Sequence, residues 1–328
     1  NLVSRILTPL MKPIFNVSGA GAFSLSMSLM SGYPIGAKIV SNLRQNNAIT
    51  KLEADRMVCF SSTSGPLFIL GAISVGMLNN PLLGPLIIYP HYLGALTVGI
   101  LLRFYGTKKS YTQDYSNKVE GKLILDENLS IGSVLANSVR NSISTIALIG
   151  GFIIFYSVLT ELIFLSKPFN ILTSLINRKV LIDIEILKGF VAGILELTTG
   201  CERISNAHID TIYKIAIINF LVGWSGISVH SQALSFMGST DINNKLYLFS
   251  KFFHGLFSSF YSLLFYLIKY GSIVESSFLQ DNHIAKPIYI LGWSKLFIIS
   301  SKLAISTTIF IFISSAIMRI LDYTFFQR

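Results

Sequence analysis

Charged residues are scarce in this sequence, and acidic residues are the scarcest of them. Of the 328 residues, 13% are charged, with 16 Asp and Glu against 26 Lys and Arg. Soluble globular domains carry about 25% charged residues. Together with 52% hydrophobic residues and a mean hydropathy of +0.61, this scarcity excludes a soluble domain and predicts an integral membrane protein.

Cysteine is also scarce, and the histidines are scattered. Two cysteines, Cys59 and Cys201, give no disulfide framework, and the five histidines lack the spacing of zinc ligands. The sequence also lacks a phosphate-binding loop and a Gly-x-Ser-x-Gly nucleophile motif. We therefore expect no enzymatic activity, no catalytic or metal-binding residue and no cofactor, other than a coupling ion such as a proton or sodium.

A nucleic-acid-binding motif is missing as well, although the net charge is +10. We expect no nucleic-acid partner, because a basic excess without a basic face or motif does not indicate one. The excess of Lys and Arg is explained by their enrichment in the cytoplasmic loops of membrane proteins and by attraction to anionic lipids. The sequence begins with Asn1 rather than Met, and we expect a further segment upstream of it.

Long apolar runs are what the sequence does contain. A membrane-spanning helix needs roughly 20 mostly apolar residues. Four runs meet this length, at 81–102, 142–164, 246–268 and 288–317. They are too long for barrel strands and lack the alternation of barrel strands, so they predict an all-α polytopic membrane protein.

Two further stretches are apolar but interrupted twice each by glycine, proline and small polar residues. The interruptions lie at 31–38 and 61–66, and again at 196–203 and 222–226. Irregular backbone at membrane depth is tolerated only where protein or a water-filled cavity satisfies it. Paired interruptions of this kind are typical of transporter binding sites. We interpret them as re-entrant hairpins at 14–47 and 184–207, each followed by a broken helix, at 54–78 and 209–237.

The order of hairpin, broken helix and two spans occurs twice, in residues 1–165 and 166–328. A hairpin returns to the side from which it entered, so each half crosses the membrane three times. An odd number of crossings gives the second half the opposite orientation. The sequence therefore predicts an inverted repeat whose two hairpins meet at mid-membrane.

In the first half, Pro34 is expected to end one half-helix and begin the next. The new helix would present free N–H groups to an anion, with Gly36 allowing close approach and Lys38 adding a charge. The hydroxyls at 62–64 supply hydrogen-bond donors and acceptors. The alternative for 31–38 is a tight turn in which Lys38 is solvated. The alternative for 61–66 is a kinked helix whose hydroxyls bond its own backbone. The candidate substrate contacts here are Tyr33, Gly36, Lys38, Ser62, Thr63 and Ser64.

In the second half, Glu196 follows an apolar run. A carboxylate at membrane depth costs about 2.5–3.5 kcal/mol or more, which makes it a functional candidate. We expect Glu196 to couple transport to protons or sodium with Arg203 as its partner; the alternative places Glu196 in interfacial water. The candidate substrate contacts of this half are Thr198, Thr199, Gly200, Ser225 and Ser228.

Several segments carry a resemblance to a known family. They are MSGYPIGAK at 30–38, LEADR at 52–56, STSGPLFILGA at 62–72, PHYLGA at 90–95 and ELTTG at 196–200. They resemble the YlbJ or SpoVV sporulation integral membrane proteins, which contain a nucleoside-recognition or gate region and are distantly similar to concentrative nucleoside transporters. Those transporters place two hairpins and two unwound helices around one site, as in the layout above.

The resemblance implies export of dipicolinic acid, a planar dicarboxylate, from the mother cell across the outer forespore membrane. The leading hypothesis is therefore a transporter for a small anionic solute that works by alternating access around a mid-membrane site. Its expected partners are that solute and the lipid bilayer, and a homo-oligomer is left open. The alternatives are a nucleoside transporter and a non-transporting membrane scaffold in sporulation.

Overall fold

The computed structural model describes residues 11–106, 130–179 and 183–270, and within these it is helical and contains no strand. The predicted all-α class is thereby confirmed. Three helical stretches of the described chain are long and apolar enough to cross a membrane: Pro81–Leu102, Gly132–Leu165 and Thr211–Met237.

The predicted ranges 14–47 and 54–78 contain a hairpin and a broken helix, whose first helix begins three residues before the predicted 54. Their helical elements are α2 (Ala20–Ser31), α3 (Ile35–Gln45), α4 (Lys51–Ser61) and the π-helical η1 (Leu67–Met77). A capping box starts α4, because the Thr50 side chain accepts from Glu53 N while the Glu53 carboxylate accepts from Thr50 N. Pro66 directly precedes η1 and separates it from the extended residues that end α4.

The predicted hairpin range 184–207 and broken-helix range 209–237 hold two helices each. Its helices are α8 (Ile184–Leu195), α9 (Leu197–Asn206), α10 (Thr211–Trp224) and α11 (Gly226–Met237). One extended residue, Glu196, separates α8 from α9. One residue with a positive φ of 74°, Ser225, separates α10 from α11.

Three of the four predicted spans fall on helices among the remaining elements, and two of them, 81–102 and 142–164, belong to the stretches long and apolar enough to cross a membrane. The remaining elements follow in chain order. They are η2 (Pro81–Leu83), α5 (Gly84–Leu102), α6 (Ile131–Leu165), α7 (Lys167–Lys179), α12 (Asn244–Phe265) and η4 (Tyr266–Tyr270). Helix α6 begins eleven residues before the predicted 142, because the Ser130 side chain caps it by accepting from Ser133 N at 3.2 Å. The predicted span 288–317 lies outside the described residues.

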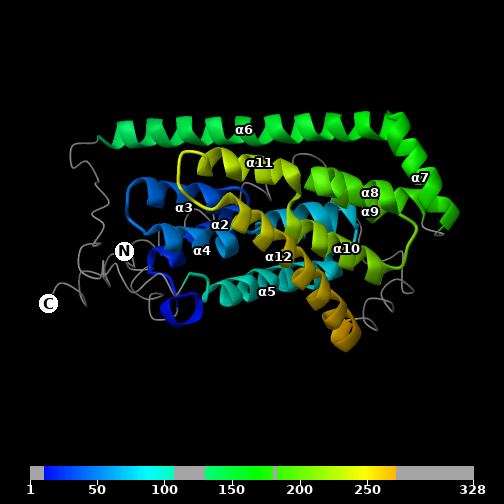
Figure 1. Cartoon of the computed structure of the whole chain (residues 1–328), viewed down its shortest axis with the longest axis horizontal. Helices are drawn as coiled ribbons and strands as arrows, with labels where there is room; N and C mark the ends of the chain where they lie inside the picture. Colours follow the sequence, from blue (N-terminus) through cyan, green and yellow to red (C-terminus); the bar gives the residue numbers. More distant parts are fainter. Residues whose placement is uncertain (1–10, 107–129, 180–182, 271–328) are drawn as a thin grey trace, which may run out of the picture.

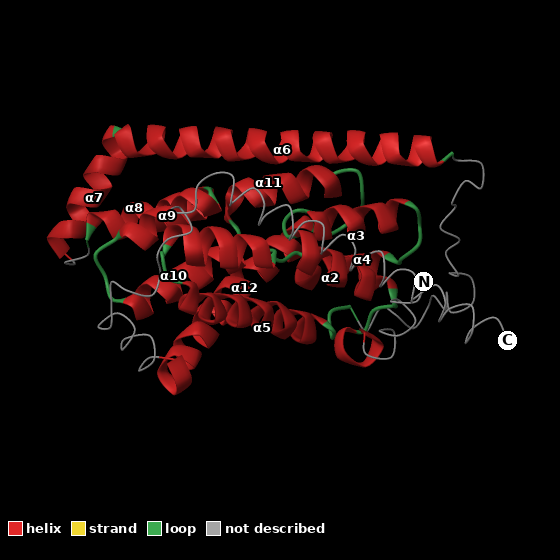
Figure 2. Ribbon diagram, turned by 180° about the vertical axis from the view of Figure 1, so that it is seen from behind, coloured by secondary structure: helices red, strands yellow, loops and turns green. Residues whose placement is uncertain are grey.

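Helix α6 runs along one side of the molecule, with α5 on the opposite side (Figure 1). The hairpin α2–α3 lies toward one end of the long axis and the hairpin α8–α9 toward the other, as Figure 2 also shows from behind. Helix α12 packs against α10 and α5. An inverted repeat of 1–165 and 166–328 requires its two hairpins to enter from opposite ends. The inverted repeat itself stays a prediction.

A polar layer separates two apolar clusters of the core. One cluster gathers hairpin α2–α3, α4 and the beginning of α12, and the other gathers hairpin α8–α9, η1 and α10. Two elements pass from one cluster to the other through buried polar residues: α4–η1 runs from Phe60 through Ser62, Thr63 and Ser64 to Ile69, and α5 runs from Val98 through His91 to Ile87. Helix α12 joins the first cluster through Tyr247 and also buries Lys251 and His254. The interruptions therefore lie at the level where the core changes from apolar to polar.

Candidate functional site

The break between α4 and η1 exposes backbone groups that helical hydrogen bonds cannot satisfy. Side chains from α2, α5 and α12 satisfy them instead, as buried backbone requires. The four bonds are Lys251 Nζ to Ser62 O at 2.9 Å, Thr63 N to Ser28 Oγ at 3.1 Å, Ser64 N to His91 Nε2 at 3.0 Å and Tyr92 Oη to Ser64 O at 3.2 Å. The break is thus a built feature, held by polar residues from three helices.

The break between α10 and α11 is held by contacts with both hairpins. Tyr33 Oη, at the tip of hairpin α2–α3, donates to Val222 O at 3.1 Å. Trp224 Nε1 donates to Ile194 O of hairpin α8–α9 at 3.2 Å. The two halves of the chain therefore meet at this break.

Lys251 of α12 lies at the centre of these contacts. Its side chain is fully buried, and Nζ lies 2.8 Å from Tyr33 Oη, 2.9 Å from Ser62 O and 2.9 Å from His254 Nδ1. All three partners are neutral acceptors. The four ion pairs found in the described residues do not include Lys251, so no carboxylate of this part of the chain pairs with it.

Two histidines extend the cluster away from Lys251. If Lys251 donates to His254 Nδ1, then His254 carries its proton on Nε2, which donates to His91 O at 2.8 Å. His91 Nε2 accepts from Ser64 N, so the His91 proton is on Nδ1. That nitrogen is buried and has no partner. The same applies to Ser62 Oγ, Tyr247 Oη and both ring nitrogens of His230.

The comparison with known proteins decides the family. The chain is 33% identical over 280 residues to the "Sporulation integral membrane protein YlbJ" of Bacillus subtilis (strain 168), a match that covers 80% of this chain and 68% of that protein. The chain belongs to the YlbJ family. No family model and no solved structure matches it. The resemblance to the nucleoside-recognition gate region and to nucleoside transporters stays a prediction.

Two glycines predicted to contact substrate are packing residues in this YlbJ-family protein. A Cβ on Gly36 would lie 2.0 Å from Ser61 O, so Gly36 is where α3 meets the end of α4. A Cβ on Gly200 would lie 2.0 Å from Gly193 Cα, so Gly200 lets α9 approach α8. The predicted close approach is present at Gly36, but the neighbour is backbone rather than ligand.

The two predicted charges, Lys38 and Arg203, face α6 instead of the central cluster. Lys38 Nζ donates to Thr145 Oγ1 at 2.7 Å. Arg203 pairs with Glu161. The expected pairing of Arg203 with Glu196 is therefore wrong, because Arg203 follows Glu196 by two turns of α9 and points toward the neighbouring α6.

Glu196 is buried, with 2% of its surface exposed. Its carboxylate accepts from Thr199 N at 2.7 Å and from Thr199 Oγ1 at 2.9 Å. It therefore caps α9, where the helix N-terminus stabilises a negative charge. Thr199 also contacts Ser157 of α6 at 3.3 Å, and the neighbouring Thr198 is half-buried.

The other predicted contacts divide between the two breaks. Ser62, Thr63 and Ser64 line the first break, and the backbone carbonyl of Ser62 accepts from Lys251 Nζ. Ser225 forms the second break, and its hydroxyl donates to Trp224 O. Ser228 is buried in the first turn of α11 and accepts from Gln232 Nε2 at 3.4 Å. The structure thus brings Tyr33 and Ser62 together at Lys251. Ser225 lies at the second break, three residues after Val222, which accepts from Tyr33.

Sequence reasoning missed the residues at the centre, Lys251, His254, His91 and Tyr247. A signal was present in the predicted span 246–268. Polar residues recur there every fourth position, a spacing that places them on one face of a helix: Ser250, His254, Ser258 and Ser262, with Lys251 beside the first. All five are buried, so this face of α12 points into the protein and not toward lipid.

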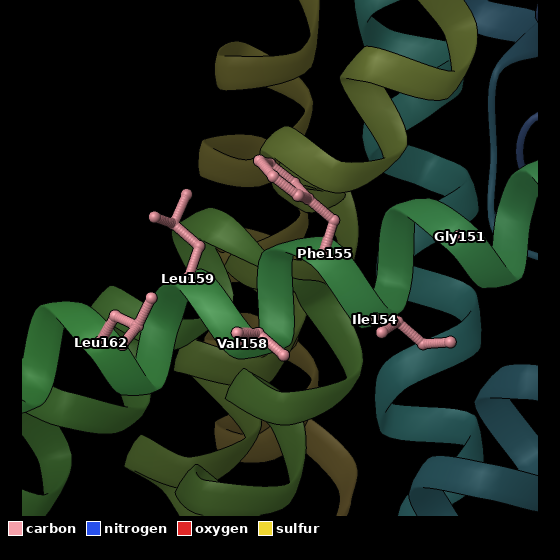
Figure 3. A pocket seen from close by; sticks show the side chains of 6 residues that line it. All are labelled: Gly151, Ile154, Phe155, Val158, Leu159 and Leu162. Carbon is pink, nitrogen blue, oxygen red and sulfur yellow. The ribbon is translucent and has the colours of Figure 1, made fainter.

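The described surface is hollowed on α6, away from the polar cluster. One hollow of about 420 Å³ is lined by Gly151, Ile154, Phe155, Val158, Leu159 and Leu162 (Figure 3). These residues are apolar, and Ile154 and Phe155 remain 67% and 60% exposed. In an integral membrane protein such a face contacts lipid, so it is not the candidate site. Among the described residues no group of three His, Cys, Asp or Glu side chains forms a metal site.

Proposed function

We propose that this protein is a transporter that moves a small anionic solute through the membrane by alternating access. The observation that carries the proposal is the bond from Tyr33 Oη to Val222 O at 3.1 Å. It joins the tip of hairpin α2–α3 to the end of α10, beside the break at Ser225. Two interruptions far apart in the sequence meet inside the molecule, which is the arrangement a central binding site requires.

The solute we propose is dipicolinic acid, carried across the outer forespore membrane during sporulation. The name of the Bacillus subtilis relative, a sporulation integral membrane protein, supports the biological setting. The buried Lys251 among neutral partners supports an anionic solute, because a buried cation is stabilised by an opposite charge. Glu196 is the residue that we propose to couple transport to a proton or sodium.

The movement that we propose is a shift of the two hairpins against α6. Both hairpins make polar contacts with α6: Lys38 with Thr145, Thr199 with Ser157 and Arg203 with Glu161. Hairpin α8–α9 adds an apolar cluster in which Ala192 joins Phe164 and Phe169. Each polar contact is a contact between single side chains, which can be exchanged for water or another partner as a hairpin moves. The opposite face of α6 stays against lipid throughout.

The test is uptake of radiolabelled dipicolinate into proteoliposomes that contain the purified protein. We expect uptake above that of empty liposomes, with competition by phthalate and none by uridine. Tyr33→Phe removes the hydroxyl that joins the two breaks, and we expect it to lower uptake about tenfold, the equivalent of one buried hydrogen bond. Tyr213→Phe is the matched control, since Tyr213 is 59% exposed on α10 and its loss leaves uptake unchanged.

Two outcomes would contradict the proposal. Uptake of uridine in place of dipicolinate would identify a nucleoside transporter. Absence of uptake for every solute, together with a stable complex with another sporulation protein, would identify a scaffold.

A further inference from the structure

We propose that Lys251 is the centre of a carboxylate-binding site, in which Ser62, His91 and Tyr247 supply the further hydrogen-bond donors. The choice of ligand class rests on the proposed transport function, whereas the site rests on the contacts of the described residues. Of these four residues, the sequence identified only Ser62 as a candidate substrate contact. Lys251, His91 and Tyr247 were not among the candidates.

The unpartnered groups around Lys251 have one property in common, which is that each can donate a hydrogen bond. Ser62 Oγ, Tyr247 Oη and His91 Nδ1 are buried without a partner, and the tautomer argument above places the proton of His91 on Nδ1. Buried donors are normally satisfied, so each indicates a missing acceptor. A cation surrounded by orphan donors is the chemistry that receives an anion.

The geometry brings these donors to one place. Tyr247 lies one turn before Lys251 on the same face of α12. Ser62 supplies the carbonyl that accepts from Lys251 Nζ at 2.9 Å. His91 stacks on His254 with ring centroids 4.6 Å apart, and His254 is itself bonded to Lys251. Three elements, α4, α5 and α12, therefore converge on one buried cation.

A carboxylate fits this arrangement better than a neutral solute. A neutral nucleoside would leave the charge of Lys251 buried and uncompensated, which is costly in a low-dielectric interior. A carboxylate compensates one charge and offers two oxygens as acceptors for the remaining donors. The two cations predicted from the sequence, Lys38 and Arg203, are engaged with α6, so they do not share this role.

The experiment measures ligand-induced thermal stabilisation of the purified full chain in detergent. The probes are dipicolinate, picolinate, its neutral isostere picolinamide, and uridine. A ligand that binds only the folded form raises the apparent stability by mass action. We expect both carboxylates to stabilise the protein, and picolinamide and uridine to have no effect.

Two substitutions locate the site. Lys251→Met keeps the length of the side chain and should lower carboxylate affinity at least about tenfold, the value of a charge-assisted hydrogen bond. Lys245→Met is the matched control, because Lys245 lies on the same helix but is exposed. Tyr247→Phe keeps the ring and removes only the orphan hydroxyl, and it should lower affinity about fivefold.

The outcomes separate this inference from the transport proposal. Stabilisation by carboxylates that is lost in Lys251→Met, without uptake in proteoliposomes, supports the site and contradicts transport. Uptake that is unchanged in Lys251→Met supports transport and overturns the site. Equal stabilisation by picolinate and picolinamide overturns the site. If Lys251→Met does not fold, unchanged affinity in Tyr247→Phe overturns it.

Discussion

Gly36 is a position where a single added methyl group should destabilise the protein strongly. An alanine Cβ there would lie 2.0 Å from Ser61 O and 2.8 Å from Ser61 C, whereas ordinary contacts begin at 3.4 Å. Both neighbours are backbone atoms that cannot rotate away, so α3 has to move off α4. Overpacking of a close contact costs about 1–3 kcal/mol, and a backbone neighbour favours the upper end of that range.

The displacement should also reach the candidate site. The Ser24 hydroxyl lies 3.1 Å from Ser61 Oγ and 3.4 Å from Gly36 O, and its one proton is available to either acceptor, so Ser24 contacts both helices here. Tyr33, which bonds Val222 and Lys251, precedes Gly36 by three residues. We therefore expect Gly36→Ala to lower both the unfolding temperature and dipicolinate uptake.

The assay follows unfolding with a thiol-reactive fluorophore. Cys59 and Cys201 are the two cysteines of the sequence, and both are free and fully buried, so they react when the protein unfolds. At roughly 2–4 °C per kcal/mol, the expected decrease is on the order of 5–10 °C. Gly150→Ala is the control, because nothing lies within 4 Å of a Cβ there. An unfolding temperature of Gly36→Ala within about 1 °C of the unsubstituted protein would refute the packing argument.

Two further predictions concern acidic residues. The hydrogen bond from Arg44 holds the pKa of Asp241 below its ordinary value. Because the pKa is lower in the folded state than in the unfolded state, the pair stabilises the protein above a pH of about 4. This contribution is lost as the pH falls through the folded-state pKa. Both side chains are partly exposed, so the effect is at most about 1 kcal/mol, and Asp241→Asn should flatten the acid limb of a plot of unfolding temperature against pH; an unaltered acid limb contradicts it. Glu196→Gln keeps an acceptor for Thr199 but removes the charge, so we expect a stability loss of at most about 1 kcal/mol and uptake that no longer responds to a proton or sodium gradient; a retained gradient response excludes Glu196 as the coupling residue.

Local chemistry explains why the interruptions could be predicted. Pro34 and Pro66 disfavour helical backbone in the residue before them, and two small residues, Ser225 and Gly226, both take a positive φ at the second break. Each of these backbone preferences acts within a few residues, so the interruptions can be recognised from the sequence. The same holds for α4, which a capping box at Thr50 and Glu53 begins.

The partners of the charged side chains could not be predicted in this way. Glu196 and Arg203 are seven residues apart and looked like a pair, but Arg203 meets Glu161, 42 residues earlier. Lys251 appeared as one charge in an apolar run, and its partner Tyr33 is 218 residues away. Spacing along a helix fixes the face on which a residue lies, but not the element that covers that face.

The sequence by itself determined the class of this protein and the positions of its broken elements, because composition and backbone preference are local properties. The tertiary structure alone decided which groups are buried together. It assigned Gly36 and Gly200 to helix contacts, turned Lys38 and Arg203 toward α6, and enclosed Lys251 with His91 and Tyr247. Hydrogen bonds and buried charges depend on distances of about 3 Å between residues far apart in the chain, and folding alone sets those distances.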